Sequence, residues 1–489
     1  MLRQNISYLA FIIGHCYNVT FANAFTTVHN HPKILKETFW RKKQELATDH
    51  IIIRHPCHTS EKTRISMTLI DDDLITRSQA IARSLAFPLG FATAFRTGAA
   101  ISVIGQPRLP DHFPSTNNNR NNDYGNNNIN NNNIIEAVGS RIIRLPKSGA
   151  RVRLFYPAAL PISSSMKYVP YAPYCTDGRL TSDSMAGLVG FRQLGLSFLL
   201  AHLADATSGC YKDVQPLVVN SKKGRSRFPL LVYSHGYGGN MDMAAYFLRA
   251  IASTGTVVAA VEHTDGTASS TQLKDGTMQP FSPNLMTGRE QLSCRAEELL
   301  EVYEMLVGSE NQLQSSSVEE EFGNIIDPTK VFLGGHSYGA PSALLAAFRA
   351  SKENQKGIST TRDVNIAGII LHDPALAMGY DDMLGDNNDN TMKNIPTISY
   401  TSDEYNRAGV RYGDSTVHVK GAFHGNFVDA PLWAPSWVMR PLSAIIPAAG
   451  PANPNQVHDE LANSAAAFMA SRKVHLASVM EGRLFELVE

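Results

Sequence analysis

Gly335-His336-Ser337-Tyr338-Gly339 is the stretch of this sequence whose residue types point most directly to chemistry. An apolar run, 331–333, precedes it, and a segment of small residues, 341–350, follows it. Strand, Gly-x-Ser-x-Gly turn and helix in this order are typical of a nucleophile elbow, a strained turn that points a serine hydroxyl out of a sheet. The hydroxyl then lies above the helix N-terminus, where a developing oxyanion is stabilised. Because so short a pattern also arises by chance, its value depends on partners elsewhere in the chain.

A serine nucleophile needs a base within hydrogen-bond reach and a carboxylate that orients the base. In sheets of this kind the chain order is serine, acid, histidine, each after a strand. His424 follows an apolar run and has glycines on both sides, although an exposed loop histidine would look the same. Asp373 follows one predicted strand and Asp403 follows the next. The sequence therefore predicts Ser337 as nucleophile and His424 as base, with two candidates for the acid.

An oxyanion hole requires two backbone N–H groups, one from the residue after the serine and one from an earlier loop. Tyr338 supplies the first. The glycine-rich turn 234–239, which follows an apolar run, is the candidate for the second, and an ordinary strand-to-helix connection is the alternative.

Composition narrows the class of protein. The chain has 489 residues, of which 43% are hydrophobic, and its 44 basic and 44 acidic residues balance. Nothing in this balance indicates nucleic acid as a partner. The five cysteines are scattered without a CxxC pair, which favours free thiols over a zinc site, and a bridge between Cys175 and Cys210 is the alternative. No metal or cofactor is expected, and the acidic stretch 381–389 lacks calcium-loop spacing.

The first 133 residues differ from the rest. Residues 1–24 have features of a signal segment, with an apolar stretch and a small-residue cleavage site. We predict a partly disordered leader over 25–116, of which the first part, 25–54, is basic. Two destinations stay open, the secretory pathway or exterior and a plastid reached through a two-part presequence. Residues 117–133 hold twelve asparagines in seventeen positions and are interpreted as a linker. No stretch is apolar enough for a transmembrane helix. The catalytic domain is predicted over 138–489.

Alternating strands and helices must position these groups, which indicates a parallel sheet wrapped by helices. The predicted strands are 230–234, 257–261, 330–333, 366–371, 397–400 and 415–419, preceded by a hairpin of 142–145 with 151–156. The predicted helices are 185–204, 244–253, 289–307, 341–350 and 454–471.

Five blocks in this order resemble the platelet-activating-factor acetylhydrolases of the plasma and intracellular type II kind, which are serine esterases with the α/β-hydrolase fold. The blocks are 151–157, 228–236, 258–269, 334–339 and 420–429. Glu262-His263-x-Asp265, within the third block, has no generic reason to recur in hydrolases and is the most specific of these signals. The resemblance implies an α/β-hydrolase fold, with a mostly parallel central sheet flanked by helices. We interpret Glu262 and His263 as a buried charged pair with a structural role.

Carried over by position, the resemblance implies Ser337 as nucleophile, His424 as base and Asp373 as acid. Tyr237 and Tyr338 would donate their backbone N–H groups to the oxyanion. The family places its acid after the strand that follows the nucleophile helix, which favours Asp373 over Asp403.

The chain departs from the family at two places. Ala340 stands where the family usually has a second glycine after the elbow, and we expect no loss of activity from this small residue. The acid block reads Leu371-His372-Asp373-Pro374, where the family has Leu-Asp and an aromatic residue, so the alignment is open by one residue.

The function expected from the resemblance is hydrolysis of a short or oxidised sn-2 acyl ester of a phospholipid through an acyl-enzyme on Ser337. The alternatives are a general carboxylesterase or polyester hydrolase of the same fold, and a hydrolase-fold binding protein without catalysis. A set of apolar residues would either form a rim that contacts lipid or belong to the core and the pocket wall. The members of this set are Leu188, Phe191, Leu194, Phe198, Leu199, Leu432, Trp433 and Trp437.

Overall fold

The structure is a computed structural model that describes most of the chain after residue 136. The described residues are 137–159, 170–188, 191–192, 195, 197–221, 224–308, 317–355, 364–380, 382–383, 392, 394–433, 449–471 and 484–488. The predicted signal segment (1–24), the leader (25–116) and the Asn-rich segment (117–133) lie outside these residues.

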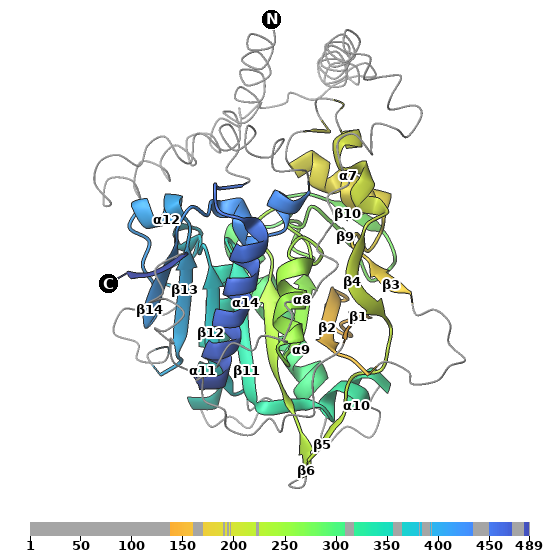
Figure 1. The fold of residues 1–489 in the computed structure, drawn as a ribbon, viewed down its shortest axis with the longest axis vertical. Coiled ribbons are helices and arrows are strands. Elements are labelled where there is room, and N and C mark those ends of the chain that lie inside the picture. The colour runs from red at the N-terminus through yellow and green to blue at the C-terminus, as the bar shows by residue number, and fades with distance from the viewer. Residues whose placement is uncertain are drawn as a thin grey trace, which may run out of the picture. The chain divides into compact units, whose positions relative to one another are not determined.

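The chain divides into two compact units. Met1–Gly98 and Val189–Ser197 make up the first, and Ala99–Leu188 and Phe198–Glu489 the second. The sheet and helices that carry the candidate site belong to the second unit, and Figure 1 shows their described residues in colour.

Within the described residues, an eleven-stranded sheet forms the centre of the second unit (Figure 1). Its strands, in spatial order, are β15 (Phe485–Val488), β14 (Ser415–Val419), β13 (Thr397–Thr401), β12 (Ile366–His372), β11 (Ile326–His336), β7 (Phe228–Ser234), β8 (Val257–Glu262), β2 (Arg151–Pro157), β1 (Val138–Arg144), β4 (Thr207–Lys212) and β3 (Tyr171–Pro173). The strands from β14 to β8 pair in parallel, which confirms the predicted parallel sheet. β2 pairs antiparallel with both β8 and β1, and β15 antiparallel with β14.

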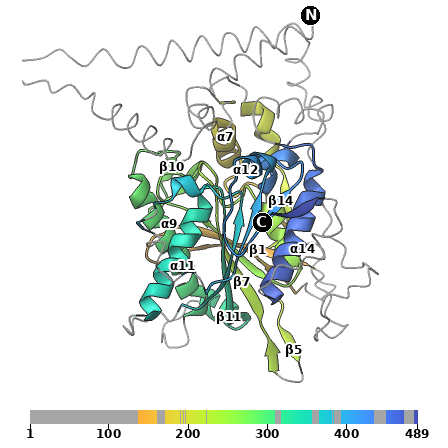
Figure 2. The ribbon, with the colours of Figure 1, turned by 90° about the vertical axis from the view of Figure 1, so that its left-hand side faces the viewer.

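Helices cover both faces of the sheet, as Figure 2 shows. α8 (Ala245–Ser253) and α14 (Pro454–Ser471) pack together on one face. α9 (Gly288–Val307) and α11 (Gly339–Gln355) pack together on the other. Because both faces are covered, the central strands are apolar throughout rather than alternating, and every residue of β8 and β12 is buried.

Shorter elements complete the described part of the unit. They are α7 (Arg179–Leu188), the 3-10 helix η2 (Ser197–Ala204), the hairpins β5 (Val219–Ser221) with β6 (Gly224–Ser226) and β9 (Ser270–Gln272) with β10 (Met278–Pro280), α10 (Ser317–Gly323), α12 (Asp403–Arg407), and the 3-10 turns η4 (Leu376–Met378), η6 (His424–Phe427) and η7 (Ala430–Leu432). The short helices and turns η4, α12 and η6 follow the carboxyl ends of β12, β13 and β14.

The long helix α9 begins where its sequence provides a cap. Thr287 precedes it in an extended conformation, and its side chain accepts the N–H of Glu290. The Glu290 side chain in turn accepts the Thr287 N–H at 2.8 Å, which completes a capping box. This fixes the first turn of the helix that carries Arg295 and Glu298 into the centre of the unit.

The predicted strands and most predicted helices are confirmed, and the predicted hairpin pairs Ile143 with Val152 in register. The single helix expected over 185–204 is wrong. The structure instead has α7, which ends at Leu188, and a separate 3-10 helix that begins at Ser197. The prediction used an apolar pattern that spans a break at Gly190 and Gly195, and glycine weakens a helix interior.

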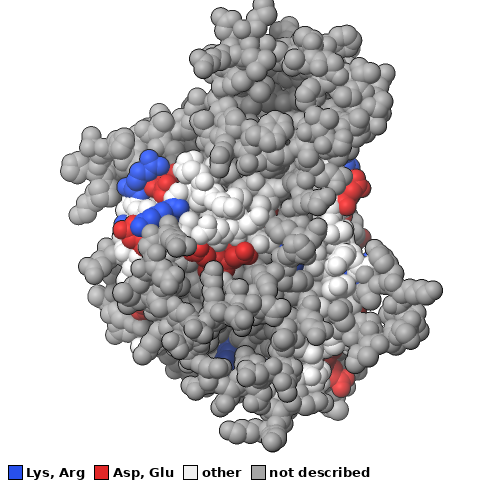
Figure 3. All heavy atoms as spheres, viewed as in Figure 1, with Lys and Arg blue, Asp and Glu red and all other residues white. Residues whose placement is uncertain are grey.

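The described surface carries both signs of charge. In the face shown in Figure 3, basic and acidic side chains lie next to each other near α12. This agrees with the equal numbers of basic and acidic residues in the chain. Among the helices in the described part of the chain, none is both long and apolar enough to cross a membrane.

Candidate active site

Ser337 lies on the tight turn between β11 and α11. Its backbone has φ 55°, a left-handed value that is rare outside glycine. The turn is tight because it packs backbone on backbone: a Cβ built on Gly335 would lie 2.3 Å from the carbonyl of Gly339. A Cβ built on Gly339 would lie 2.1 Å from the carbonyl oxygen of Ser234. These contacts explain the two glycines of the pattern and give the strained geometry of a nucleophile elbow.

The elbow is tied to the end of the neighbouring strand β12. The Ser337 N–H donates to the His372 carbonyl at 3.0 Å, and the Ala375 N–H donates to the Ser337 carbonyl at 3.1 Å. Ala340, where the resembling family has glycine, is fully buried against the strand. The residues around the serine therefore hold its backbone in the strained conformation.

Asp373 and His424 come together beside the elbow. Asp373 directly follows β12, and His424 opens η6 after β14. The Asp373 Oδ2 atom lies 2.6 Å from His424 Nδ1. Its second oxygen, Oδ1, accepts the N–H of Ser402 at 2.7 Å, and the carboxylate is completely buried. Like Ser337, Asp373 has a left-handed backbone, with φ 45°.

The rival carboxylate, Asp403, has other partners. Its Oδ1 atom accepts from His418 Nε2 at 2.8 Å and from the Gly421 N–H at 3.1 Å. Of the two candidates for the acid, Asp373 contacts His424, whereas Asp403 lies at the start of α12 and contacts His418 and Gly421.

The backbone of His424 is held on both sides. Its N–H donates to Glu404 Oε2 at 2.9 Å, and its carbonyl lies 3.3 Å from His336 Nε2. Burial lowers the pKa of His336 well below its usual range, and the neighbouring His424 lowers it further, so His336 is neutral. Burial raises the pKa of Glu404, and the hydrogen bond from His424 partly offsets this.

The turn after β7 reaches the elbow through Gly236. A Cβ built there would lie 3.1 Å from the Ser337 Cβ and 3.0 Å from His336 Nδ1, so a larger residue would require these neighbours to shift by a few tenths of an ångström. Tyr237 follows, and its ring packs edge-on against that of Tyr338 with centroids 5.7 Å apart. Within the described residues, neither the Tyr237 nor the Tyr338 backbone N–H donates to another group.

A buried arginine from α9 contacts both sides of this arrangement. Arg295 is completely buried, and its Nη1 atom donates to the His235 carbonyl at 2.7 Å. Its guanidinium lies over the Tyr338 ring, 4.8 Å from the centroid. The guanidinium also forms an ion pair with Asp265 at 2.7 Å. Burial raises the pKa of Asp265, but Arg295 and the other partners together lower it to about 2.

The predicted pairing of Glu262 with His263 is wrong, although both residues are buried as expected. Glu262 points to the other side of its strand and forms an ion pair with Arg151 at 2.8 Å. His263 Nδ1 lies 2.7 Å from Glu298 Oε2, and its Nε2 lies 2.8 Å from Ser234 Oγ. Consecutive strand residues face opposite sides of a sheet, so two neighbours at a strand end take different partners.

Three members of the predicted apolar rim are buried. Phe191 and Leu432 are each 8% exposed and Trp433 is 3% exposed. The Trp433 indole donates to the Tyr174 hydroxyl at 2.9 Å. For these three the core interpretation is the better one. Leu194 and Trp437 lie outside the described residues, as do Asp381, Asp386 and Asp389 of the acidic stretch.

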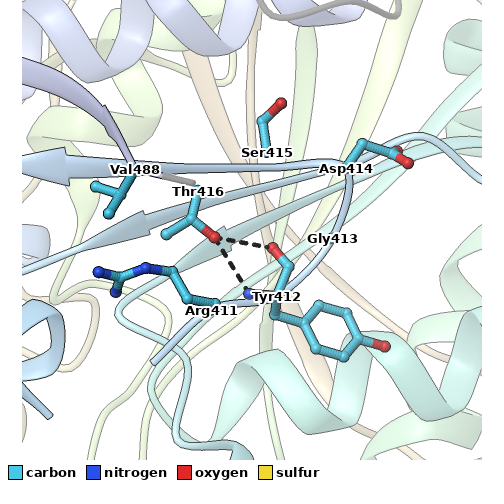
Figure 4. A pocket seen from close by; sticks show the side chains of 7 residues that line it. All are labelled: Arg411, Tyr412, Gly413, Asp414, Ser415, Thr416 and Val488. Carbon is cyan, nitrogen blue, oxygen red and sulfur yellow. Dashed lines mark hydrogen bonds between the residues drawn. The ribbon is translucent and has the colours of Figure 1, made fainter. Parts of the chain in front are cut away.

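A hollow elsewhere on the sheet has no part in this arrangement. It has a volume of about 440 Å³ and is lined by residues 411–416 and Val488 (Figure 4). Thr416 hydrogen-bonds to the backbone of Tyr412 within it. The hollow lies where β14 begins, whereas His424 follows the end of that strand.

The fold and the site together define the class of protein. From β1 to β14 the central strands lie in the order β1-β2-β8-β7-β11-β12-β13-β14, with β2 antiparallel. A serine follows β11, an acid β12 and a histidine β14. This is the arrangement of the α/β-hydrolase fold.

Within that class, the chain belongs to the family described as platelet-activating factor acetylhydrolase, isoform II, which it matches over residues 138–478. The similar curated proteins include the platelet-activating factor acetylhydrolases of dog (Canis lupus familiaris) and cattle (Bos taurus). Each is 26% identical, over 220 and 217 residues, and each alignment covers 40% of this chain and 46% of the relative. The match thus spans about half the length of these relatives.

Two solved structures are also similar to the chain. A ferulic acid esterase from Streptomyces cinnamoneus has a TM-score of 0.46 and 19% identity, covering 69% of this chain and 90% of that one. An esterase from Pyrobaculum calidifontis has a TM-score of 0.33 and 11% identity, covering 86% of this chain and 97% of that one.

Sequence reasoning assigned no role at the site to the residues that surround the candidate base and the oxyanion turn. Glu404 and Tyr405 follow β13 at the same edge of the sheet as the other candidates, and this position was the available signal. For Arg295, the available signal was a basic residue within the sequence of α9, a helix that packs on the sheet.

Proposed function

We propose that this protein is a serine ester hydrolase in which Ser337 is the nucleophile, His424 the general base and Asp373 the acid that orients the base. The observation that carries the proposal is the 2.6 Å contact of His424 Nδ1 with the buried Asp373 carboxylate, beside a serine held at φ 55° on an elbow. Membership of an acetylhydrolase family supports ester hydrolysis as the reaction.

In the first half of the reaction, Ser337 Oγ attacks the ester carbonyl and His424 Nε2 takes the hydroxyl proton. Asp373 keeps the other proton of the imidazole on Nδ1 and stabilises the imidazolium that forms. The backbone N–H groups of Tyr237 and Tyr338 donate to the oxyanion. The C–O bond then breaks, and the leaving alcohol takes the proton from His424.

In the second half, water attacks the acyl group on Ser337 and gives a proton to His424 Nε2. The tetrahedral intermediate collapses, the carboxylic acid leaves, and the proton returns to Ser337 Oγ. Each proton moves between His424 and Ser337, the leaving alcohol or the attacking water, so His424 is the group that carries protons in both halves of the reaction.

As substrate class we propose phospholipids with a short or oxidised sn-2 acyl chain, with 1-alkyl-2-acetyl-glycerophosphocholine as the type. The names of the dog and cattle relatives support this choice. Contact with a lipid surface, through apolar residues of the predicted rim other than Phe191, Leu432 and Trp433, is part of the same proposal.

A fluorophosphonate probe tests the nucleophile, because it reacts with an activated serine. We expect the full chain to be labelled and the Ser337→Ala variant not to be. Ser184→Ala, which removes a serine of α7 away from the elbow, is the matched control and should be labelled like the wild type. An unlabelled wild-type chain would contradict the proposed function.

Substrate class is tested by comparing turnover of 1-alkyl-2-acetyl-glycerophosphocholine with that of p-nitrophenyl acetate and p-nitrophenyl octanoate. We expect kcat/KM for the phospholipid to exceed that for both soluble esters. Equal or higher values for the soluble esters would favour a general carboxylesterase of the same fold.

A further inference from the structure

An aromatic side chain lies at the candidate site without a role in the steps above. Tyr405 belongs to α12, which follows β13. Its ring stacks on the His424 imidazole, with centroids 5.2 Å apart and planes inclined by 11°. The Ser337 side chain lies close enough to its phenol to lower the phenol's pKa. One side chain therefore stacks on the group that receives the proton and lies near the group that loses it.

The backbone of Tyr405 is fixed relative to Asp373. The Tyr405 N–H donates to Ser402 Oγ at 3.2 Å, which caps α12. The N–H of the same Ser402 donates to Asp373 Oδ1 at 2.7 Å. The carbonyl of Tyr405 accepts from the Val410 N–H at 3.0 Å. Because Ser402 joins the cap of α12 to Asp373, the position of the tyrosine follows that of the acid.

The residue before it acts on the same histidine. Glu404 accepts the His424 N–H at 2.9 Å, so α12 holds His424 by its backbone as well as by its ring. The ring of His336 also packs against the His424 imidazole, with centroids 4.5 Å apart and planes inclined by 35°. Imidazole rotation about its Cβ bond would therefore break the stack with Tyr405 as well as the bond to Asp373.

Burial raises the pKa of the Tyr405 phenol above its usual range, and Asp373 and Glu404 raise it further, whereas Ser337 lowers it. The phenol is thus protonated throughout the physiological range. A protonated phenol can both donate and accept a hydrogen bond, so it can interact with the Ser337 hydroxyl as donor or as acceptor.

Resting on the proposed function, we propose that Tyr405 is a positioning residue for acyl transfer. Its ring keeps the His424 imidazole in the plane that Asp373 sets, and its phenol orients the Ser337 hydroxyl before the ester binds. Removal of either contact slows the attack on the ester, since alignment of the reacting atoms contributes to the rate. Neither contact binds the ester itself, so the effect falls on kcat rather than on KM.

Two variants separate the ring from the hydroxyl. Tyr405→Phe keeps the stack and removes the phenol oxygen, whereas Tyr405→Leu removes both. The matched control is Tyr211→Leu, because Tyr211 of β4 is also half-buried and its ring also packs against an aromatic ring, that of Tyr171, with centroids 4.9 Å apart and planes inclined by 31°. The measurements are kcat and KM on p-nitrophenyl acetate and the second-order rate of fluorophosphonate labelling, all per active site.

Tyr405→Leu is expected to lower kcat and the labelling rate by about 10-fold or more, with KM within about 2-fold, since a stacked aromatic pair and a hydrogen bond each contribute on the order of a few-fold. Tyr405→Phe is expected to recover part of this, with a loss of about 3-fold. Tyr211→Leu should lower the unfolding temperature and leave kcat unchanged.

If the probe labels the wild type and Tyr405→Leu has an unchanged kcat, the role of Tyr405 is overturned while the proposed function stands. A loss confined to KM also overturns this role, because it would assign the ring to substrate binding. If Tyr405→Leu does not fold, Tyr405→Phe decides, and wild-type kcat in that variant overturns the role of the phenol. A wild-type chain that the probe does not label overturns the proposed function and this inference with it.

Discussion

At the scale of single residues, the two carboxylates near the candidate base differ in what surrounds them. Asp373 is completely buried and accepts from Ser402 as well as contacting His424. Asp403 is 30% exposed at its side chain and pairs with His418. An acid that holds a catalytic imidazole in one tautomer must be buried and fixed, which is the environment of Asp373.

This difference predicts unequal losses in two matched variants. Asp373→Asn should lower kcat about 10³- to 10⁴-fold, because an amide in this place favours the wrong imidazole tautomer. Asp403→Asn keeps a side-chain oxygen for Gly421 and should leave kcat within about 3-fold of the wild type. Steady-state turnover of p-nitrophenyl acetate measures both. A larger loss in Asp403→Asn would reverse the assignment of the acid.

The sequence predicted which residues meet but not how they are held. Ser337, Asp373 and His424 each follow a parallel strand, and carboxyl ends of parallel strands meet at one edge of the sheet. Which of the two acids, one strand apart, reaches the histidine depends on the conformation of the loops. That conformation depends on contacts such as the hydrogen bond from the Ser402 N–H to Asp373, and such contacts leave no pattern in a single sequence. For the same reason the sequence indicated no role for Tyr405.

At the scale of elements, helix α9 connects the two halves of the proposed oxyanion hole. Arg295 donates to the His235 carbonyl, two residues before Tyr237, and lies over the ring of Tyr338. A planar guanidinium makes both contacts at once, whereas an ammonium provides only charge. Helix α9 therefore sets the distance between the turn after β7 and the elbow.

Arg295→Lys keeps a positive charge beside Asp265 and loses the planar fork. We expect kcat to fall about 10- to 100-fold with little change in KM, because oxyanion donors act in the transition state. Arg153→Lys is the control, since Arg153 is also buried and pairs with Asp242 at 2.5 Å, on a strand that carries no candidate group. Equal effects of the two variants on kcat would show that Arg295 acts only through stability.

The elbow gives a second prediction at this scale. Gly335→Ala should abolish activity or folding, because a Cβ there would lie 2.3 Å from the Gly339 backbone. Ala340→Gly restores the residue usual in the family and should retain wild-type kcat while losing about 1 kcal/mol of stability, as glycine does in a helix. Chemical denaturation and turnover assays measure the two quantities. An active Gly335→Ala variant would contradict the tight packing of the turn.

Elements were predicted best where burial is complete. Strands such as β12 are buried along their whole length and almost entirely apolar, because helices cover both faces of the sheet. Their existence and position could therefore be predicted from the sequence. The stretch 185–204 was apolar without helical continuity, and glycines divided it. The edge strand β15 was missed because a short strand at a sheet edge is half exposed and has no continuous apolar run.

At the scale of the whole molecule, the centre of the fold holds ionisable groups whose burial links stability to pH. Burial raises the pKa of Glu298 to about 8, and nearby Asp265 also raises it. Burial raises the pKa of both Glu262 and Asp429 to about 7. Buried histidines such as His263 have lowered pKa values and remain neutral in the fold.

The sign follows from which state holds more protons. A carboxyl with a raised pKa keeps its proton in the folded state over a range in which the unfolded chain has released it. Its contribution to stability is complete below the unfolded pKa and is lost as pH rises to the folded value. Histidines with lowered pKa values act in the opposite direction, but only up to about pH 6.5, where the unfolded histidine also becomes neutral. Above that pH, the carboxyls with raised pKa values determine how stability changes with pH.

We therefore expect the free energy of unfolding to fall between pH 6.5 and pH 8, by about 1 kcal/mol per pH unit for each carboxyl that still holds its proton. Glu298→Gln is neutral at every pH and should reduce this slope, most clearly between pH 7 and pH 8, where Glu298 alone of the three still titrates. Glu297→Gln, which changes the adjacent exposed residue on α9, should leave the slope as in the wild type. Urea unfolding at three pH values measures it. A wild-type stability that is constant or rises over this range would show that Glu298 is ionised within the fold, as an ion pair with His263 rather than as the neutral pair that burial favours.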